Sequence, residues 1–233
     1  MIRNFLFKLF FFTGIALICI LFLPALFLPQ NIVLFGGKIM GHWCALCLRI
    51  FLSTNIIIKG KENIIKNEKF FIASSHQSMF ETFFLQTIFN SPIFILKKEL
   101  LKIPIFGWYL KKIGSISINR NKTTKENLGF FNIISSIIKS SDRPLIIFPQ
   151  GTRLMPKEKF PFKKGSGRIY EELKIKCQPV AINSGHVWPK EGLLKPNKNL
   201  TVSILKPIEA DLNKDIFLRK LEENIYYELE NLD

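Results

Sequence analysis

The chain has 233 residues, which is enough for one domain of ordinary size together with a membrane anchor. Its residues are 48% hydrophobic, and 23 of them are Phe, so the composition supports a large core and excludes a disordered chain. The formal net charge of +15 indicates an anionic partner, and nucleic acid and an anionic membrane surface both qualify. Because the sequence contains no recognised nucleic-acid-binding module, we expect anionic membrane lipids as the partner and no nucleic acid.

The first predicted element is an apolar helix close to the N-terminus. Residues 9–28 contain no charged side chain, and Arg3 and Lys8 precede them. A run of roughly 20 apolar residues matches the thickness of a hydrocarbon core. The run is long for the apolar part of a signal peptide and ends without a small-residue cleavage site, so we expect it to be retained. Pro24 and Pro29 are expected to kink or end this helix.

Residues 31–52 form a second hydrophobic stretch, which carries Lys38, His42 and Arg49. It is too polar for a comfortable spanning helix but suits an interfacial or re-entrant one. If the first helix crossed alone, the basic remainder of the chain would lie outside, against the positive-inside tendency. We therefore predict that residues 1–53 form a membrane-embedded or interfacial helical hairpin. It either dips into one leaflet or crosses and returns, on the cytoplasmic face of a membrane that we expect to be the bacterial inner membrane.

Two of the four cysteines, Cys44 and Cys47, have the spacing of a metal or redox motif. No second pair of this kind and no paired His accompanies them, and they lie in an apolar helical stretch. We interpret them as small buried hydrophobic side chains and predict no metal site.

Residues 54–233 are predicted to form an α/β domain, because short β-branched runs alternate with helical segments. Leu218, Leu221, Ile225 and Leu229 form one stripe of a C-terminal amphipathic helix. This alternation favours a mixed, largely parallel sheet flanked by helices, in which binding sites gather at the carboxyl ends of strands. Strands are predicted at residues 55–59, 70–73, 93–96, 115–118, 145–148, 179–182 and 200–204.

His76 and Glu81 follow the strand predicted at residues 70–73, with the spacing of a base and its orienting carboxylate. On a continuous helix, positions five apart diverge by roughly 140°, so this pairing needs a strand end, a turn and a helix start. In that setting His76 would act as a general base, while Glu81 would fix its tautomer and stabilise the imidazolium. The alternative is a hydrogen-bonded structural His at a helix start.

His186 and Glu191 repeat the same spacing, in a segment whose Gly and Pro residues indicate a loop. We interpret His186 as a structural loop or core His, with a supporting role in the site as the alternative. A serine hydrolase is the natural competitor for a His-based enzyme. However, no Gly-x-Ser-x-Gly elbow is present, so direct transfer to a bound hydroxyl is favoured over a covalent intermediate.

Residues 148–153, Phe-Pro-Gln-Gly-Thr-Arg, resemble a phosphate clamp. A turn at Gly151 and Thr152 exposes backbone N–H groups, and Arg153 supplies a guanidinium fork that suits phosphate. A plain β-turn would carry the same Gly.

Two further cations stand at predicted strand ends. Arg120 follows the strand predicted at residues 115–118, and a solvated charge is the alternative to a phosphate contact there. Lys97 follows the strand predicted at residues 93–96, where a substrate, a lipid headgroup or water would each suit it.

These blocks, in this order, resemble the 1-acylglycerol-3-phosphate O-acyltransferase family, also called lysophosphatidic acid acyltransferases. The resemblance extends over roughly residues 59–207. It comprises the family's His-x4-Asp block at His76 and Glu81, its Arg-bearing block at residues 114–120, its Phe-Pro-Glu-Gly-Thr-Arg block at residues 148–153, a Val-Pro-Val-like strand at residues 178–181, and the link between the first two blocks at residues 97–108.

The resemblance implies a glycerophosphate acyltransferase-like α/β sandwich. It also implies a reaction in which the acyl group of an acyl-CoA or acyl-ACP thioester passes to the sn-2 hydroxyl of 1-acylglycerol-3-phosphate, giving phosphatidic acid for phospholipid synthesis. His76 would deprotonate that hydroxyl, and Arg120 and Arg153 would hold the glycerol phosphate. The turn at Gly151 and Thr152 would shape the phosphate pocket. No cofactor is expected besides the acyl donor.

The sequence departs from the family pattern at two positions. Glu81 replaces the usual Asp, and Gln150 replaces the Glu of the third block, where it would support the turn. Glu81 keeps the charge but changes its reach, whereas Gln150 loses a charge. Two alternatives therefore stay open: an acyltransferase that acts on another lyso-lipid, such as a lyso-ornithine lipid or a lysophospholipid, and a catalytically inactive membrane-surface binding protein.

Overall fold

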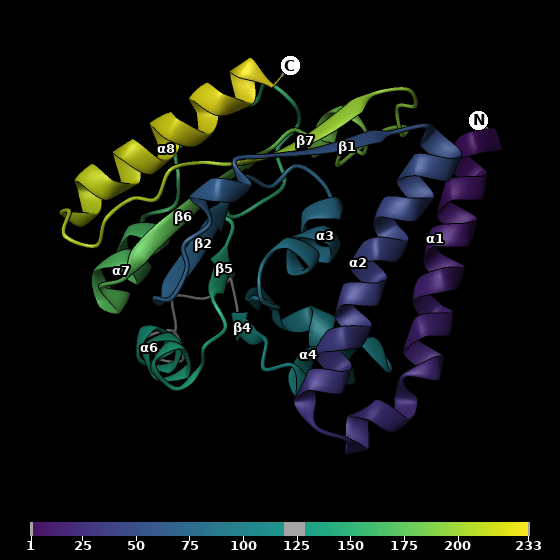
Figure 1. The fold of residues 1–233 in the computed structure, drawn as a ribbon, viewed down its shortest axis with the longest axis horizontal. Coiled ribbons are helices and arrows are strands. Elements are labelled where there is room, and N and C mark those ends of the chain that lie inside the picture. The colour runs from purple at the N-terminus through teal and green to yellow at the C-terminus, as the bar shows by residue number, and fades with distance from the viewer. Residues whose placement is uncertain (1, 119–128, 233) are drawn as a thin grey trace.

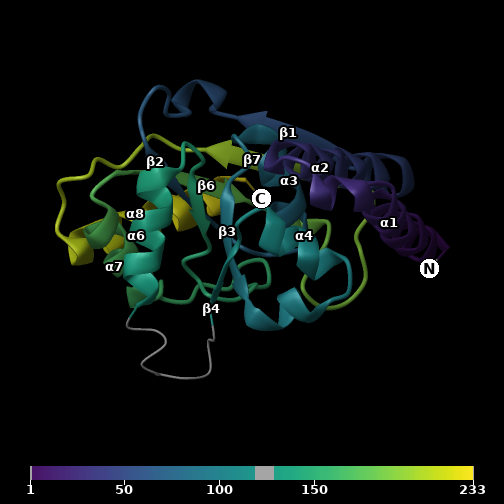
Figure 2. The same ribbon diagram turned by 90° about the horizontal axis from the view of Figure 1, so that it is seen from below.

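A computed structural model describes residues 2–118 and 129–232 of the chain. It contains a central sheet with helices on both faces and a pair of long helices at one side (Figure 1). In the view from below in Figure 2, α6 and α7 lie on one side of the sheet, and the pair of long helices lies on the other side. The principal helices are α1 (Ile2–Leu21), α2 (Gln30–Leu52), α3 (Phe80–Ile88), α4 (Phe106–Lys112), α6 (Phe130–Ser140), α7 (Lys164–Leu173) and α8 (Lys214–Asn231).

The first two helices form the predicted hairpin, although their bounds differ from the apolar run in the sequence. α1 begins at Ile2 and ends at Leu21, and a short 3-10 helix, η1 (Leu23–Phe27), joins it to α2. Pro24 lies at the start of η1, and Pro29 directly precedes α2. Proline lacks the N–H that would continue α1, which is why the helix ends before the apolar run does.

The hairpin is bound to the rest of the chain at both of its ends. Near the N-terminus, the Asn4 side chain accepts from the Leu194 N–H (2.7 Å) and donates to the Leu194 carbonyl (3.2 Å). Near the end of α1, the Tyr109 hydroxyl of α4 donates to the Cys19 carbonyl (2.6 Å). The Asn4 side chain of α1 and the Tyr109 side chain of α4 therefore hold α1 in a defined position against the α/β fold.

The described strands form one seven-stranded sheet in the order β1-β7-β6-β2-β5-β3-β4. Of the described strand pairs, only β6–β7 is antiparallel, which confirms the prediction of a mixed, largely parallel sheet. Each predicted strand is present, and β6 begins earlier than expected because residues from Lys176 onward pair with β2. The strands are β1 (Asn55–Lys59), β2 (Phe70–Ser74), β3 (Ile93–Lys97), β4 (Ile116–Ile118), β5 (Leu145–Ile147), β6 (Lys176–Ile182) and β7 (Asn199–Ile204).

Each face of the sheet has its own core, because alternate side chains of a strand point to opposite faces. In β2, Ile72 packs with the hairpin, α3 and α4, whereas Phe71 and Ala73 pack with α6, α7 and α8. Phe7 and Phe11 of α1 are fully buried in the first core. That core therefore crosses the predicted boundary between residues 1–53 and 54–233, and each part covers apolar surface of the other.

Cys44 and Cys47 lie on the buried face of α2, within the first core. Among the residues that the structure describes, no group of three or more His, Cys, Asp or Glu side chains is placed to hold a metal ion. The two thiols pack as small apolar side chains.

Candidate active site

Three strand ends meet at one edge of the sheet. β2 is paired in parallel with β5 on one side and with β6 on the other, so their carboxyl ends lie together. His76 follows β2, residues 148–153 follow β5, and Ser184 follows β6 in the short 3-10 helix η4 (Ser184–His186). Segments that are far apart in the sequence are thereby brought to one place, as expected for a parallel sheet.

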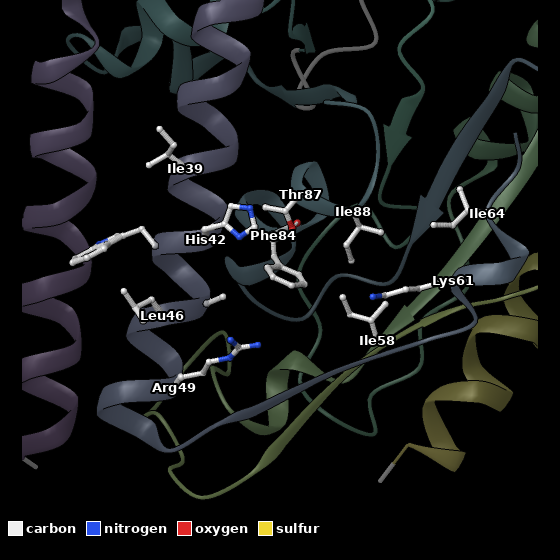
Figure 3. Close-up of a pocket in the computed structure, with 12 residues that line it drawn as sticks. Ile39, His42, Leu46, Arg49, Ile58, Lys61, Ile64, Phe84, Thr87 and Ile88 are labelled. Atoms are coloured by element: carbon white, nitrogen blue, oxygen red, sulfur yellow. Dashed lines mark hydrogen bonds between the residues drawn. The ribbon is translucent and has the colours of Figure 1, made fainter. Parts of the chain in front are cut away.

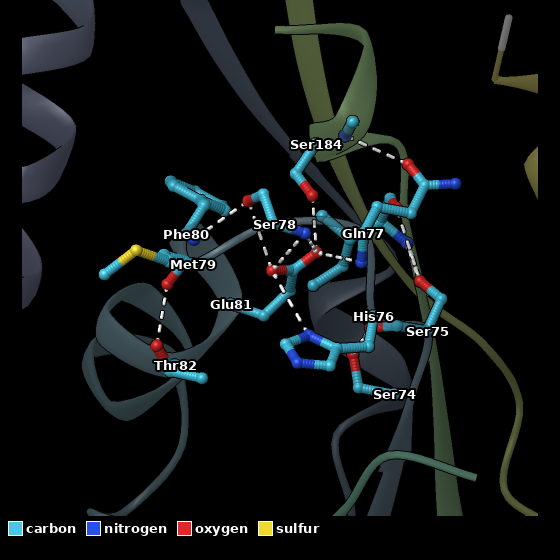
Figure 4. A network of polar contacts seen from close by, with 12 residues as sticks. Ser74, Ser75, His76, Gln77, Ser78, Met79, Phe80, Glu81, Thr82 and Ser184 are labelled. Atoms are coloured by element: carbon cyan, nitrogen blue, oxygen red, sulfur yellow. Dashed lines mark hydrogen bonds and ion pairs between the residues drawn. The ribbon is translucent and has the colours of Figure 1, made fainter. Parts of the chain in front are cut away.

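The predicted pairing of His76 and Glu81 has the expected local geometry: a strand end, a turn and a helix start (Figure 4). The Ser78 hydroxyl accepts from the Phe80 N–H (2.9 Å) and caps the start of α3. His76 Nδ1 lies 3.7 Å from Glu81 Oε2, which is longer than a hydrogen bond and within reach of an ion pair. Nδ1 is buried and makes no hydrogen bond to a described residue, so the carboxylate is the group that faces it.

Glu81 is a fully buried carboxylate surrounded by donors. It accepts from the N–H groups of Gln77 (3.0 Å) and Ser78 (3.2 Å to each oxygen), and from the hydroxyls of Ser78 (3.2 Å) and Ser184. Burial by itself raises the pKa of Glu81, but His76, Ser184 and the Gln77 N–H outweigh it and hold the pKa below its usual value. Glu81 is therefore ionised at neutral pH, at the N-terminus of α3, where the helix dipole also favours a negative charge.

This charge makes stability depend on pH in a defined direction. Since the pKa of Glu81 is lower in the folded state, its ionised form stabilises the fold above the ordinary pKa of 4.5, and this contribution is lost as the pH falls through the folded pKa. We expect Glu81→Gln to lower the free energy of unfolding by about 1–3 kcal/mol at pH 7. The difference between variant and wild type should shrink on acidification below pH 4.5, as measured by denaturant unfolding in detergent. A difference that stays constant from pH 7 down to well below pH 4.5 would contradict this assignment.

The segment after β5 also contacts His76. The His76 ring stacks on Phe148, with centroids 4.1 Å apart and an angle of 18° between the planes. The backbone N–H of His76 donates to Gln150 Oε1 (2.9 Å), and the backbone carbonyl of His76 accepts from the Leu154 N–H (2.9 Å). The His76 side chain is 16% exposed, so one part of the ring faces outward while the other is fixed.

The bond to His76 also explains why Gln is compatible with position 150. The side chain of Gln150 is buried (1% exposed), and the atom that contacts His76 is its amide oxygen, acting as an acceptor. A carboxylate would supply the same acceptor. Replacement of Glu by Gln therefore retains this backbone contact while removing a buried charge.

The turn predicted at residues 150–153 is present, and its binding of phosphate stays a prediction. Gly151 has φ +72°, a left-handed conformation that favours glycine, and its N–H donates to the Phe148 carbonyl (2.9 Å). Thr152 is exposed and Arg153 is half-buried. Arg153 makes no hydrogen bond or ion pair with any described residue, so its guanidinium is available to an anion.

The structure does not bring the other predicted site residues into contact with the His76–Glu81 pair in the same way. Lys97 is exposed at the end of β3, and β5 separates that strand from β2. Arg120 lies outside the described residues, and its phosphate contact stays a prediction. His186 is half-buried in η4, while Glu191 lies 3.8 Å from Lys190.

Sequence reasoning missed two residues of this site, Ser184 and Gln77. Ser184 donates to Glu81, and the side-chain oxygen of Gln77 accepts from the Gly185 N–H (3.0 Å). The available signal was the position of Ser184 two residues after the strand predicted at residues 179–182, at the edge where site residues gather. The loop of His186 thus supports the site through Ser184 and Gly185.

Comparisons with known proteins agree with this fold. The sequence matches the acyltransferase family over residues 55–183. It is 30% identical over 182 residues to the 1-acyl-sn-glycerol-3-phosphate acyltransferase of Pseudomonas aeruginosa, covering 74% of this chain and 68% of that protein. The enzyme of the same name from Helicobacter pylori is 33% identical over 162 residues, 67% of each chain. That of Saccharomyces cerevisiae is 32% identical over 193 residues, 78% of this chain and 63% of its own length.

A solved structure resembles nearly the whole chain. The crystal structure of the 1-acyl-sn-glycerophosphate (LPA) acyltransferase PlsC from Thermotoga maritima has a TM-score of 0.82, covers 99% of this chain and 96% of its own, and is 24% identical in sequence. The likeness shows that the two chains share a fold, from the apolar helix pair to the mixed sheet. Together with the sequence match over residues 55–183, these observations show that the chain belongs to the acyltransferase family.

Proposed function

We propose that the chain is an O-acyltransferase that transfers a fatty acyl group from an acyl-CoA or acyl-ACP thioester to the sn-2 hydroxyl of 1-acylglycerol-3-phosphate, giving phosphatidic acid. The observation that carries the proposal is the pairing of His76 with a buried, ionised Glu81 beside the turn that presents Arg153. The names of the similar bacterial and yeast enzymes support this acceptor.

In the proposed mechanism, the neutral His76 ring keeps its proton on Nδ1, toward Glu81, so that Nε2 is the free base. Nε2 takes the proton of the acceptor hydroxyl as that oxygen attacks the thioester carbonyl. The new C–O bond forms, the C–S bond breaks, and His76 returns the proton to the leaving thiolate. Glu81 stabilises the imidazolium in between, which is the role of a buried carboxylate behind a catalytic His.

The acceptor phosphate would lie against Arg153 and the Gly151–Thr152 turn, with Arg120 as a second cation and Lys97 in support. We expect Arg153→Ala to raise KM for the phosphorylated acceptor by roughly 10- to 100-fold, the loss of one charge-assisted contact, with a smaller change in kcat. The measurement is steady-state kinetics at varied acceptor concentration. Arg168→Ala, which removes an exposed cation of α7, is the matched control, and an unchanged KM in Arg153→Ala would place the phosphate elsewhere.

The test of the whole proposal is acyl transfer by purified, folded protein in vesicles. Labelled acyl-CoA and acyl-ACP are supplied with a panel of 1-acylglycerol-3-phosphate, lysophospholipids and a lyso-ornithine lipid. Label in phosphatidic acid supports the proposed acceptor, and label only in another product replaces it. Transfer to none of them would exclude both kinds of acyltransferase and leave a membrane-surface binding protein.

We further propose that α1 and α2 lie in the membrane. Both helices are long and apolar enough to cross one, and α1 exposes more large apolar side chains than a soluble surface normally carries on one helix. Those side chains are Ile2, Phe5, Leu9, Phe10, Phe12, Leu17, Ile20 and Leu21. A hairpin keeps both of its ends on one side, and the basic charge of the chain favours the cytoplasmic face, with the bacterial inner membrane as the expected location.

A further inference from the structure

An open groove of about 840 Å³ lies between α2 and the opposite wall formed by α3, β1 and the following residues (Figure 3). Its α3 wall comes from Phe84, Thr87 and Ile88, whereas His76 precedes the other end of that helix. The groove is thus separate from the acyl-transfer site. Its volume lies in the range of small-molecule binding sites.

The walls of the groove are largely apolar. Most of the side chains that line it are aliphatic or aromatic: Ile39, Trp43, Ala45, Leu46, Ile58, Ile64, Phe84 and Ile88. The side chain of Leu46, in α2, is 44% exposed. An apolar surface of this kind is unfavourable in water and favours an apolar occupant.

Two cations extend into the groove from opposite walls. Arg49 comes from the last turn of α2, where the helix dipole favours a positive charge, and Lys61 comes from the 3-10 helix η2 (Lys61–Asn63) after β1 (Figure 3). Neither side chain makes a hydrogen bond or an ion pair with a described residue. The described residues that line the groove include no Asp or Glu that would neutralise these two charges.

The ligand that matches both features has an anionic head and an apolar tail. A free phosphate would leave the apolar walls uncovered, and a neutral lipid would leave Arg49 and Lys61 uncompensated. The α2 wall belongs to the hairpin that we place in the membrane, so lipids of the bilayer reach the groove directly.

We propose that this groove binds one anionic phospholipid of the membrane, with its phosphate between Arg49 and Lys61 and an acyl chain along the apolar walls. The proposal rests on the membrane position of the hairpin and is independent of the acyl-transfer reaction. A lipid bound there bridges α2 to the segment after β1 and so links the hairpin to the sheet.

The test measures lipid retention by the full chain in detergent, using native mass spectrometry. Phosphatidylglycerol, phosphatidylcholine and free glycerol 3-phosphate serve as the probes. We expect phosphatidylglycerol to bind more tightly than either of the others. Arg49→Gln/Lys61→Gln should weaken its binding by roughly 10-fold or more, since each cation near an anionic lipid contributes severalfold.

Lys102→Gln/Lys111→Gln is the matched control, because it removes the same charge from exposed positions of the segment around α4. If the two double variants weaken phosphatidylglycerol binding equally, the general surface charge of the protein explains the binding and the proposal is wrong. If glycerol 3-phosphate binds as tightly as phosphatidylglycerol, the groove binds an anion and not a lipid, and the proposal is wrong. Vesicle flotation tests the membrane position of the hairpin separately. Failure of the protein to float with vesicles would refute that position. Flotation without a preference for phosphatidylglycerol would refute only the lipid site in the groove.

Discussion

Replacing His76 by alanine is expected to lower kcat for acyl transfer by roughly 10³-fold, the typical contribution of a positioned general base. The imidazole stacks on Phe148, and Nδ1 faces Glu81. The His76 backbone donates to the Gln150 side-chain oxygen and accepts from the Leu154 N–H. His76 is thus an imidazole that faces a buried carboxylate. The measurement is single-turnover transfer of labelled acyl groups in vesicles.

The variant must stay folded and membrane-bound for this result to be informative. Circular dichroism and vesicle flotation test both, and they should match the wild type because His76 lies at the sheet edge and outside the hairpin. His186→Ala is the matched control, since this residue repeats the His-x4-Glu spacing in the sequence; its kcat should be nearly unchanged. Turnover that survives in His76→Ala would remove the proposed base.

Replacing Glu81 by glutamine is expected to have an effect of similar size, a loss of kcat of roughly 10³-fold with little change in KM. In His-dependent hydrolases, neutralising the carboxylate behind the catalytic His has an effect of this size or larger. The amide introduced by Glu81→Gln would keep the shape of the side chain but could not stabilise an imidazolium. The measurement is kcat and KM at pH 7, on protein whose fold has been checked as above.

Two milder variants separate charge from position. Glu81→Asp keeps the charge but shortens the reach toward His76 and Ser184, and we expect a loss of kcat of roughly 10-fold. Ser184→Ala removes one donor and leaves the carboxylate in place, so its loss should be smaller than that of Glu81→Gln. Wild-type kcat in Glu81→Gln would assign Glu81 to the fold alone.

Much of the fold could be predicted because its signals are local. Residues 70–73 are a short unbroken apolar run, Phe-Phe-Ile-Ala, and such a run is typical of a parallel strand buried on both faces. The hairpin could be predicted because two apolar stretches flank a proline-containing turn. The prolines indicated that the first helix ends within the apolar run, but its exact bounds, Ile2 and Leu21, could not be predicted from the run at residues 9–28.

Part of the candidate site was equally local. Five positions separate His76 from Glu81, and a strand end, a turn and a helix start bring His76 Nδ1 to 3.7 Å from Glu81 Oε2. The turn predicted at Gly151 is also local, because Gly151 adopts the left-handed conformation that favours glycine and its N–H donates to the carbonyl of Phe148, three positions earlier. These features were predictable from spacing and residue type.

The sequence by itself therefore determined the strands, the hairpin and the short-range partners of the candidate base. Only the tertiary structure decided that Gln150 binds the backbone of His76, 74 positions away, and that Ser184 binds Glu81, 103 positions away. It also decided that Arg49 and Lys61 share one groove. Such contacts depend on the strand order β6-β2-β5 and on how α2 packs over α3. The physical reason is that strand order and helix packing follow from burying apolar surface over the whole chain, which no short segment encodes.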